Sequence, residues 1–322
     1  MGRYVIRRLA WVVFVLLVIT FITYFVFFKL PPGDPATRFA GRQPTPALVH
    51  EVEQQFGLDK PFVVQYGLFV KRLFLGDQYG WPGLGISFNT RSPLRAIILQ
   101  RMAVTVQVAL GAALVWIAIG IPIGVLSALK PRSLGDRLAM GFALFGVSAP
   151  VFWLGQMFLY VFWFKLGVAA GSGYYAIGKY GFITWANHMI MPWVVLSLLF
   201  AANYARMSRG NLIETMSEDY IRTARAKGLT EKRVVVRHGL RSSMTPLVTM
   251  IGMDLGTLLG GAIITETVFN LPGLGALVVQ SVTNYDFNAI LDVTVVAAVV
   301  VTVMNLLVDV AYAYLDPRVR YT

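Results

Sequence analysis

Residues 219–246 read DYIRTARAKGLTEKRVVVRHGLRSSMTP, and the rest of the chain is organised around them. The stretch is short and strongly basic, and on both sides the sequence turns apolar at membrane-spanning length. A hydrophilic block held between hydrophobic spans is available for contact with something in the aqueous phase. The pattern therefore predicts a contact surface carried by a membrane-embedded frame.

The composition predicts a protein that crosses the bilayer several times. Of 322 residues, 57% are hydrophobic and 14% are charged, and a soluble fold would have to bury too much of itself to match those values. The chain has no cysteine, which excludes disulfides, thiol catalysis and cysteine-based metal sites. The net charge of +12 fits the Lys and Arg that membrane proteins gather on their cytoplasmic side, so we expect no nucleic acid partner.

Three regions are expected. Residues 1–30 hold a cytoplasmic flank and a first span, whose apolar core is too long for a cleaved signal peptide. Residues 31–101 form an extracytoplasmic loop with a small helical layer, in which Thr45 caps a helix that Gly57 ends, and Pro61 begins another. Residues 102–322 form a five-helix core that contains the basic block, at about 206–246.

The expected fold class is an all-α polytopic membrane protein with six transmembrane helices. The spans are placed at about 9–28, 104–129, 138–166, 189–205, 247–265 and 290–314, with a kink at Pro150. Lys and Arg are concentrated at both termini, in the loop after the second span and in the basic block. The positive-inside rule therefore places the termini and the block in the cytoplasm.

The chemistry of an enzyme is missing from the sequence. No phosphate-binding P-loop occurs, since the one Gly-Lys pair, Gly178-Lys179, is followed by Tyr180. The histidines stand alone, without carboxylates at metal-ligand spacing, so capping or surface roles are favoured over metal binding; they are His50, His188 and His238. We therefore expect no enzyme activity, no catalytic residue, no metal and no cofactor in this chain.

Asp254 is the most informative residue within the expected spans. A charge near mid-membrane costs at least about 2.5–3.5 kcal/mol and normally faces a protein interior or a wet cavity. On one continuous helix it shares a face with three further residues, which makes this row the candidate pathway lining: Asp254, Thr257, Gly261 and Thr265. Either Asp254 lines the route and meets the cationic end of a solute, or it is protonated or paired with a neighbouring helix.

The opposite face of the same expected helix carries small residues. Gly252, Gly256 and Gly260 recur every four positions, as in a small-xxx-small surface for helix packing. Glu266 and Asp309 lie near the ends of the spans, where water is available, so their charge by itself indicates no role.

The basic block has the signs of two short helices. Ser217 is a plausible N-cap, Tyr220, Ile221 and Ala224 are expected to share a face, and Gly228 can close the helix in the left-handed conformation. Thr230 and Glu231 can begin the second helix. The block is either a solvated basic loop or a docking element for another protein; the two alanines and the glycine between helix signals favour docking.

These residues carry a resemblance. Residues 219–229 (DYIRTARAKGL) resemble the cytoplasmic "EAA" loop of ABC-type importer permeases, closest to the B-type permeases of the dipeptide/oligopeptide/nickel branch. Thr223 stands where that loop often has Glu. Further matching motifs follow in order: 30–35 (LPPGDP), 56–61 (FGLDKP), 148–152 (SAPVF), 266–275 (ETVFNLPGLG) and 316–321 (DPRVRY). The family's GDLG-S run is interrupted here by residues 78–84 (QYGWPGL).

The resemblance implies a multi-pass subunit of a prokaryotic inner membrane that imports peptides delivered by a solute-binding protein. Its partners would be a second, C-type permease and two ATPase subunits, which would hold the ATP and Mg²⁺. The coupling to those ATPases would fall on seven residues: Tyr220, Ala224, Arg225, Ala226, Lys227, Gly228 and Leu229. Nickel chelates, glutathione or oligosaccharides are alternative cargoes, and a secondary transporter or channel working alone is a more remote alternative.

Overall fold

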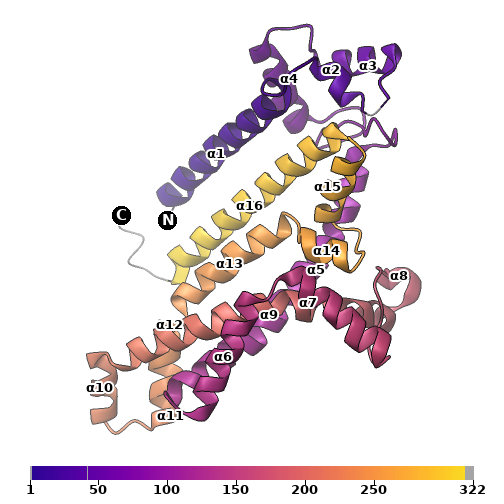
Figure 1. Cartoon of the computed structure of the whole chain (residues 1–322). Coiled ribbons are helices and arrows are strands. Elements are labelled where there is room, and N and C mark those ends of the chain that lie inside the picture. Colours follow the sequence, from indigo (N-terminus) through magenta and orange to yellow (C-terminus); the bar gives the residue numbers. More distant parts are fainter. Residues whose placement is uncertain (1, 42, 316–322) are drawn as a thin grey trace. The chain divides into compact units, whose positions relative to one another are not determined.

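The computed structural model describes residues 2–41 and 43–315 (Figure 1). In those ranges every regular element is helical, apart from two isolated bridges, Asp77–Gly80 and Ile86–Pro93. The motif at 316–321 lies outside the described residues. By contacts the chain divides into two compact units; the first is Met1–Val106, Gly256–Glu266 and Pro272–Leu306, and the second is Gln107–Leu255, Thr267–Leu271 and Leu307–Thr322.

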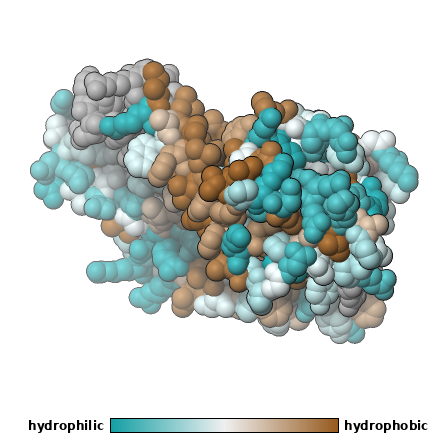
Figure 2. All heavy atoms as spheres, turned by 90° about the horizontal axis from the view of Figure 1, so that it is seen from above, coloured by the Kyte–Doolittle hydropathy of each residue, from teal (hydrophilic) through white to brown (hydrophobic). Residues whose placement is uncertain are grey.

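Four described helices are long and apolar enough to cross a membrane. They are α1 (Gly2–Phe28), α5 (Leu94–Leu129), α9 (Phe182–Met216) and α16 (Phe287–Leu315). Large apolar side chains stand exposed on them, such as Phe14 at 56% and Leu114 at 72%, and hydrophobic residues gather at the surface in Figure 2. Exposed apolar surface of this kind is stable only against lipid or another subunit.

The expected third span is a broken one. α6 (Leu134–Ser148) and α7 (Val151–Phe158), which continues as a π-helical turn over Leu159–Lys165, are bent by 103° at their junction. Ala149 has an extended backbone, with ψ of 127°, because a residue before proline is driven out of the α conformation. Pro150 is extended as well, with ψ of 133°. The kink predicted at Pro150 is confirmed, and α6 packs along α9.

The fifth expected span is shorter than predicted. α13 (Thr245–Leu259) has 15 residues, or about 22 Å of helix, against a hydrocarbon core of about 30 Å. Beyond it come α14 (Ile263–Val268) and α15 (Leu274–Thr283). By length and composition the described chain has four spans, or five if the bent pair is one span. The count of six stays a prediction.

The first unit contains the helical layer that follows α1. It consists of α2 (Pro35–Phe39), α3 (Pro46–Phe56) and α4 (Phe62–Leu75). The predicted boundaries of α3 are confirmed: Thr45 Oγ1 accepts a hydrogen bond from Leu48 N at 3.3 Å, and Gly57 ends the helix with φ at +60°.

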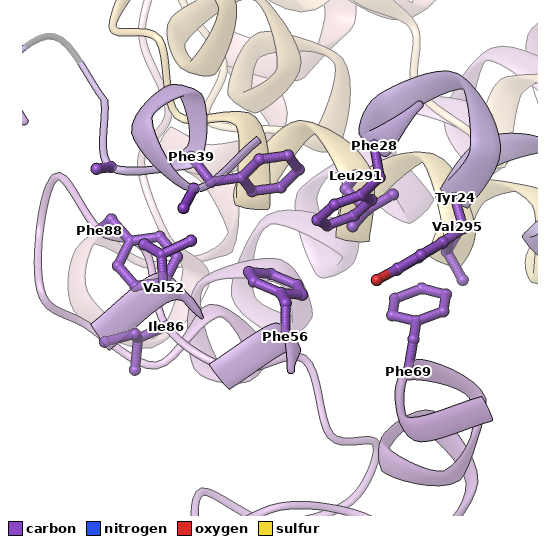
Figure 3. Close-up of a cluster of buried hydrophobic side chains, with 12 residues drawn as sticks. Tyr24, Phe28, Phe39, Val52, Phe56, Phe69, Ile86, Phe88, Leu291 and Val295 are labelled. Carbon is purple, nitrogen blue, oxygen red and sulfur yellow. The ribbon is translucent and has the colours of Figure 1, made fainter. Parts of the chain in front are cut away.

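The layer has no core of its own. Aromatic rings of its three helices pack against the C-terminal end of α1, with Tyr24 stacked on Phe28 at 4.2 Å and Phe28 on Phe39 at 4.5 Å between ring centroids. Leu291 and Val295 of α16 complete the same buried cluster (Figure 3). Because stacked aromatic pairs add to the free energy gained by burial, the layer is held to the ends of two long helices.

In the second unit, a run of short helices lies between α9 and α13. It contains α10 (Asp219–Ala226), α11 (Glu231–Arg233), a π-helical stretch over Val234–Leu240 and α12 (Arg241–Ser243). α8 (Ile177–Tyr180) precedes α9. Figure 1 shows α10 and α11 joined by a short turn at the end of this run. The basic block therefore is helical, as predicted, but in shorter pieces than two simple helices.

Candidate coupling surface and polar residues of the spans

The start of α10 differs from the prediction. Its N-cap is Glu218, whose side chain makes no capping hydrogen bond. Ser217, which was predicted to cap α10, is instead the C-cap of α9 with a helical backbone, and its hydroxyl donates back to Glu214 O at 2.6 Å. The prediction that Ser217 caps α10 is therefore wrong. The acidic side chains of Glu218 and Asp219 stabilise the positive, N-terminal end of the helix instead.

The end of α10 is a Schellman motif centred on Gly228. Gly228 has φ at +75°, and its N–H donates to Arg225 O at 2.9 Å while Leu229 N–H reaches Ala224 O at 3.4 Å. These two bonds satisfy carbonyls that the last helical turn leaves free. The predicted left-handed closure at Gly228 is confirmed.

The buried face of α10 consists of Ile221 and Ala224. Ile221 is 0% exposed and Ala224 is 7% exposed, and both pack on the fully buried Val234 of the π-helical stretch, with Leu229 beside them. Tyr220 does not share this face as predicted, since it is 44% exposed. Ala224 therefore holds the turn together from inside. The exposed residues are Asp219, Tyr220, Arg222, Thr223, Arg225, Ala226, Lys227 and Gly228.

An ion pair ties α10 to α11. The Arg225 guanidinium donates to Glu231 through Nε at 3.1 Å and Nη2 at 2.8 Å, a two-point geometry that suits Arg and carboxylate. This hydrogen bonding lowers the pKa of Glu231 and raises the pKa of Arg225. Both side chains are substantially exposed, so the pair orients the two helices more than it stabilises them.

In the spans of the second unit, Asp254 is paired. Tyr204 of α9 donates its hydroxyl proton to Asp254 Oδ2 at 2.7 Å. The tyrosine is itself fully buried, and its ring lies 5.9 Å from that of Trp116 on α5. The sequence left open whether Asp254 lines the route or is paired with a neighbouring helix, and the structure shows the pairing. Asp254 is nevertheless only partly buried.

The predicted polar row is not one face of one helix. α13 ends at Leu259, and Gly261 has φ at +129°, which breaks the helix. Thr265 lies in the next helix, α14, and is buried at 2% exposure. The prediction that Gly261 and Thr265 share a helix face with Asp254 is therefore wrong. Thr257 alone stays on the same helix, three residues further on, where side chains are neighbours.

The glycines on the other side of α13 stand close to α16. A Cβ added to Gly252 would lie 1.9 Å from Val308 Cγ2, and one on Gly256 would lie 3.2 Å from Met304 Cβ. Gly260 is past the end of the helix, so the predicted three-glycine row is wrong in its last member, although a Cβ there would still lie 3.6 Å from Ala297 Cβ. At Gly252, α13 and α16 are too close together for any larger side chain.

Glu266 was missed by the sequence argument. It lies at 0% exposure, not in water at a span end as its position suggested. Thr105 Oγ1 donates to its Oε1 at 2.7 Å and Ala276 N to its Oε2 at 2.9 Å. A Cβ on Gly273 would lie 2.2 Å from the Glu266 carboxyl carbon. The glycine spacing of the 266–275 motif is a signal that could have indicated this packing.

A second missed contact joins the start of α6 to α9. Arg209 donates to Asp136 through Nε at 2.6 Å and Nη2 at 2.8 Å, and Arg132 N also donates to this carboxylate, at 2.8 Å. Asp136 is 4% exposed. Arg209, one of the basic residues from which the orientation of the chain is predicted, thus anchors the basic loop that precedes α6.

Comparisons with known proteins agree with this architecture. The chain matches the family "Binding-protein-dependent transport system inner membrane component" over residues 120–321, and the N-terminal model of the same system over residues 1–109. It is 35% identical to the dipeptide transport system permease DppB of Alkalihalophilus pseudofirmus, covering all of both chains. It is 37% identical to DppB of Escherichia coli K12, over 100% of this chain and 99% of that one.

Two further proteins extend the comparison. The glutathione transport system permease GsiC of Escherichia coli O6:H1 is 37% identical over the full length of both chains. Among solved structures, an inward-facing conformation of the MetNI methionine ABC transporter aligns with a TM-score of 0.56 at 20% identity, covering 70% of this chain and 99% of that one, which shows a shared fold. The chain belongs to the inner-membrane permease family of binding-protein-dependent, ABC-type transport systems.

Proposed function

We propose that this chain forms half of the translocation pathway of an ATP-driven importer of peptides. In this proposal the chain crosses a prokaryotic inner membrane six times, with both termini and the run α10–α12 in the cytoplasm. A solute-binding protein delivers the peptide to the outer side, where residues 31–101 form the receiving layer. A second, C-type permease supplies the other half of the pathway, which residues 102–322 line from this side.

The observation that carries the proposal is the shape of α10. It is a two-turn helix closed by Gly228, braced from inside by Ala224 and Leu229, and linked to α11 through Arg225 and Glu231. Such a turn is rigid and presents a compact exposed face. We assign that face, Tyr220, Ala226 and Lys227 with Gly228, to a cleft of a partner ATPase, and we assign Ala224 and Leu229 to its support.

The energy source lies outside this chain in the proposal. Two ATPase subunits bind ATP and Mg²⁺, and their closure moves α10 as a rigid body against α9 and α13. The chain itself carries neither cofactor nor metal. Arg209 and Asp136, which fasten the loop before α6 to α9, would help the long helices follow the same motion.

For the cargo, the dipeptide permeases among the relatives favour short peptides. The partly accessible carboxylate of Asp254, held in place by Tyr204, fits a solute with a cationic end, and Thr257 lies beside it on the same helix. Glutathione is the second candidate, because a glutathione permease matches over its full length at equal identity. Nickel chelates and oligosaccharides stay alternatives without a specific observation in their favour.

Reconstitution tests this function. The chain is co-expressed with the permease, ATPases and solute-binding protein encoded beside it, and ATP-dependent uptake into proteoliposomes is measured for dipeptides, longer peptides and glutathione. We expect uptake of peptides that requires the binding protein and stops when ATP is withheld. Uptake by the chain in the absence of all other subunits would instead identify a secondary transporter or channel, and preferential uptake of glutathione would replace the peptide assignment.

A further inference from the structure

An apolar cavity of about 300 Å³ lies within the first unit, between three long helices and the outer layer. α1 lines it with Leu16 and Leu17, α5 with Leu99 and Met102, and α16 with Val299 among others. The polar side chain in this wall, Thr20, is already engaged, because its hydroxyl donates to Leu16 O at 2.7 Å. The wall therefore offers hydrocarbon and almost nothing that could orient a polar ligand.

The cavity is short enough to fit within one leaflet. Along α16 its lining runs from Val295 to Val300, which is about 8 Å of helix. One leaflet contributes about 15 Å to the hydrocarbon core. At about 300 Å³ the cavity is at the small end of ligand pockets, which span about 300–1,000 Å³, and this size suits a single chain of methylene groups.

Polar groups appear at the outer end of the cavity. Trp81 and Pro82 of the inserted segment 78–84 close it there, and Trp81 Nε1 donates to Phe74 O at 3.1 Å. Arg95 donates through Nε to Trp81 O at 2.6 Å, and no described residue accepts a hydrogen bond from its Nη groups. A tryptophan that is 66% exposed beside a guanidinium is the pairing found where a protein meets lipid headgroups.

We propose that this cavity is a binding site for one phospholipid of the outer leaflet. One acyl chain lies between α1, α5 and α16, and the phosphate is held by Arg95 at the mouth, next to Trp81. The inserted segment 78–84 thereby gains a function that is separate from peptide import. In the proposed topology, the lipid fills the space between α1 and the rest of the unit and fixes the distance between them.

The test compares two valines on the same helix. Val299 lines the cavity and is 37% exposed, whereas Val303, one turn further on, is 41% exposed and lies outside the lining. The assembled transporter is purified in mild detergent with added phosphatidylglycerol, and retained lipid is counted by native mass spectrometry. We expect Val299→Trp to lose one phospholipid per chain and Val303→Trp to keep it. Leu99→Trp, from α5, gives an independent blockage of the same cavity.

Two further measurements identify the headgroup and the chain. Arg95→Gln is expected to lower retention of phosphatidylglycerol several-fold and to leave retention of diacylglycerol, which lacks the phosphate, unchanged. Phosphatidylglycerol brominated on its acyl chains is expected to quench a component of the tryptophan fluorescence that Trp81→Phe removes. Peptide uptake is recorded for every variant, so a failure of the lipid site is distinguished from a failure of the import function.

Two results would overturn the proposal. The first is equal lipid retention by the wild type, Val299→Trp and Leu99→Trp. The second uses the absence of native cysteine: if Val299→Cys cross-links to another subunit in membranes, the cavity is a subunit interface and holds no lipid.

Discussion

The closure of α10 can be tested at Gly228, because this residue needs a backbone that other residues resist. Its φ is +75°, and the space where a Cβ would stand is empty within 4 Å. A side chain at this position therefore meets no steric clash with neighbours. Within this chain, the effect of a substitution therefore comes from the left-handed backbone, and Gly228→Asn controls for contact between the added side chain and a docked ATPase.

The size of the effect follows from that backbone. An L-residue in the left-handed region costs roughly 1–2 kcal/mol, and a β-branched residue is among the least tolerant. Gly228→Val is expected to lower the population of the closed turn by a factor of roughly 5–30. Opening the turn also withdraws Leu229 from Ile221 and Ala224. Gly228→Asn is expected to behave nearly as the wild type, because Asn tolerates this conformation.

The assay is ATP-dependent uptake of a dipeptide by the reconstituted transporter, recorded together with ATP hydrolysis stimulated by the loaded binding protein. We expect Gly228→Val to reach the membrane at normal level and to lose most of its uptake per ATP hydrolysed. Gly228→Asp, which adds a charge on the exposed face, is expected to uncouple the two activities as well.

Gly181 provides the matched control. It has φ at +82° and ψ at 162° with no atom near an added Cβ, a backbone region reached almost only by glycine, so Gly181→Val introduces backbone strain outside the run α10–α12. Uptake per ATP is expected to stay near the wild-type value in this variant. If Gly228→Val transports normally, or if Gly181→Val uncouples equally, then a rigid turn at Gly228 is not what transmits the motion.

Three more predictions concern charge and packing. Arg225→Glu is expected to weaken coupling because it faces Glu231, and the swap Arg225→Glu with Glu231→Arg should restore part of it; no recovery in uptake would count against the pairing. Asp254→Asn is expected to lower uptake of peptides with a cationic end more than uptake of neutral ones, and an equal change for both would remove its role in the pathway. Gly273→Ala places a Cβ 2.2 Å from Glu266 Cδ and is expected to cost about 1–3 kcal/mol, seen as a lower thermal midpoint, whereas Gly178→Ala, with open space, should leave the midpoint nearly unchanged.

Much of the local structure was predictable from sequence because it depends on residues within one turn of each other. Thr45 and Gly57 bound α3, Gly228 closes α10 and Pro150 breaks the third span, each through a backbone preference of the residue itself or of its neighbour. The wrong prediction at Ser217 also has a local cause: the serine is the C-cap of α9, and its hydroxyl donates to Glu214 O in that helix.

The position of the short helices in the candidate site was predictable, but which of their residues are buried and which are exposed was not. Periodicity alone could not decide that Ala224 is buried and Tyr220 is exposed, since that depends on Val234, which lies across the turn from α10. The prediction of one polar row was wrong because it assumed a regular helix through Gly261, where the helix is interrupted.

The sequence by itself determined that residues 219–246 form a basic, helical element between apolar spans, and that this element ends at Gly228. The tertiary structure alone decided which charges are buried and what they touch. Asp254 meets Tyr204, 50 positions away, and Glu266 meets Thr105, 161 positions away. A buried carboxylate must accept hydrogen bonds from whichever donors the packing brings close to it. The order of residues along the chain does not show which donors these are.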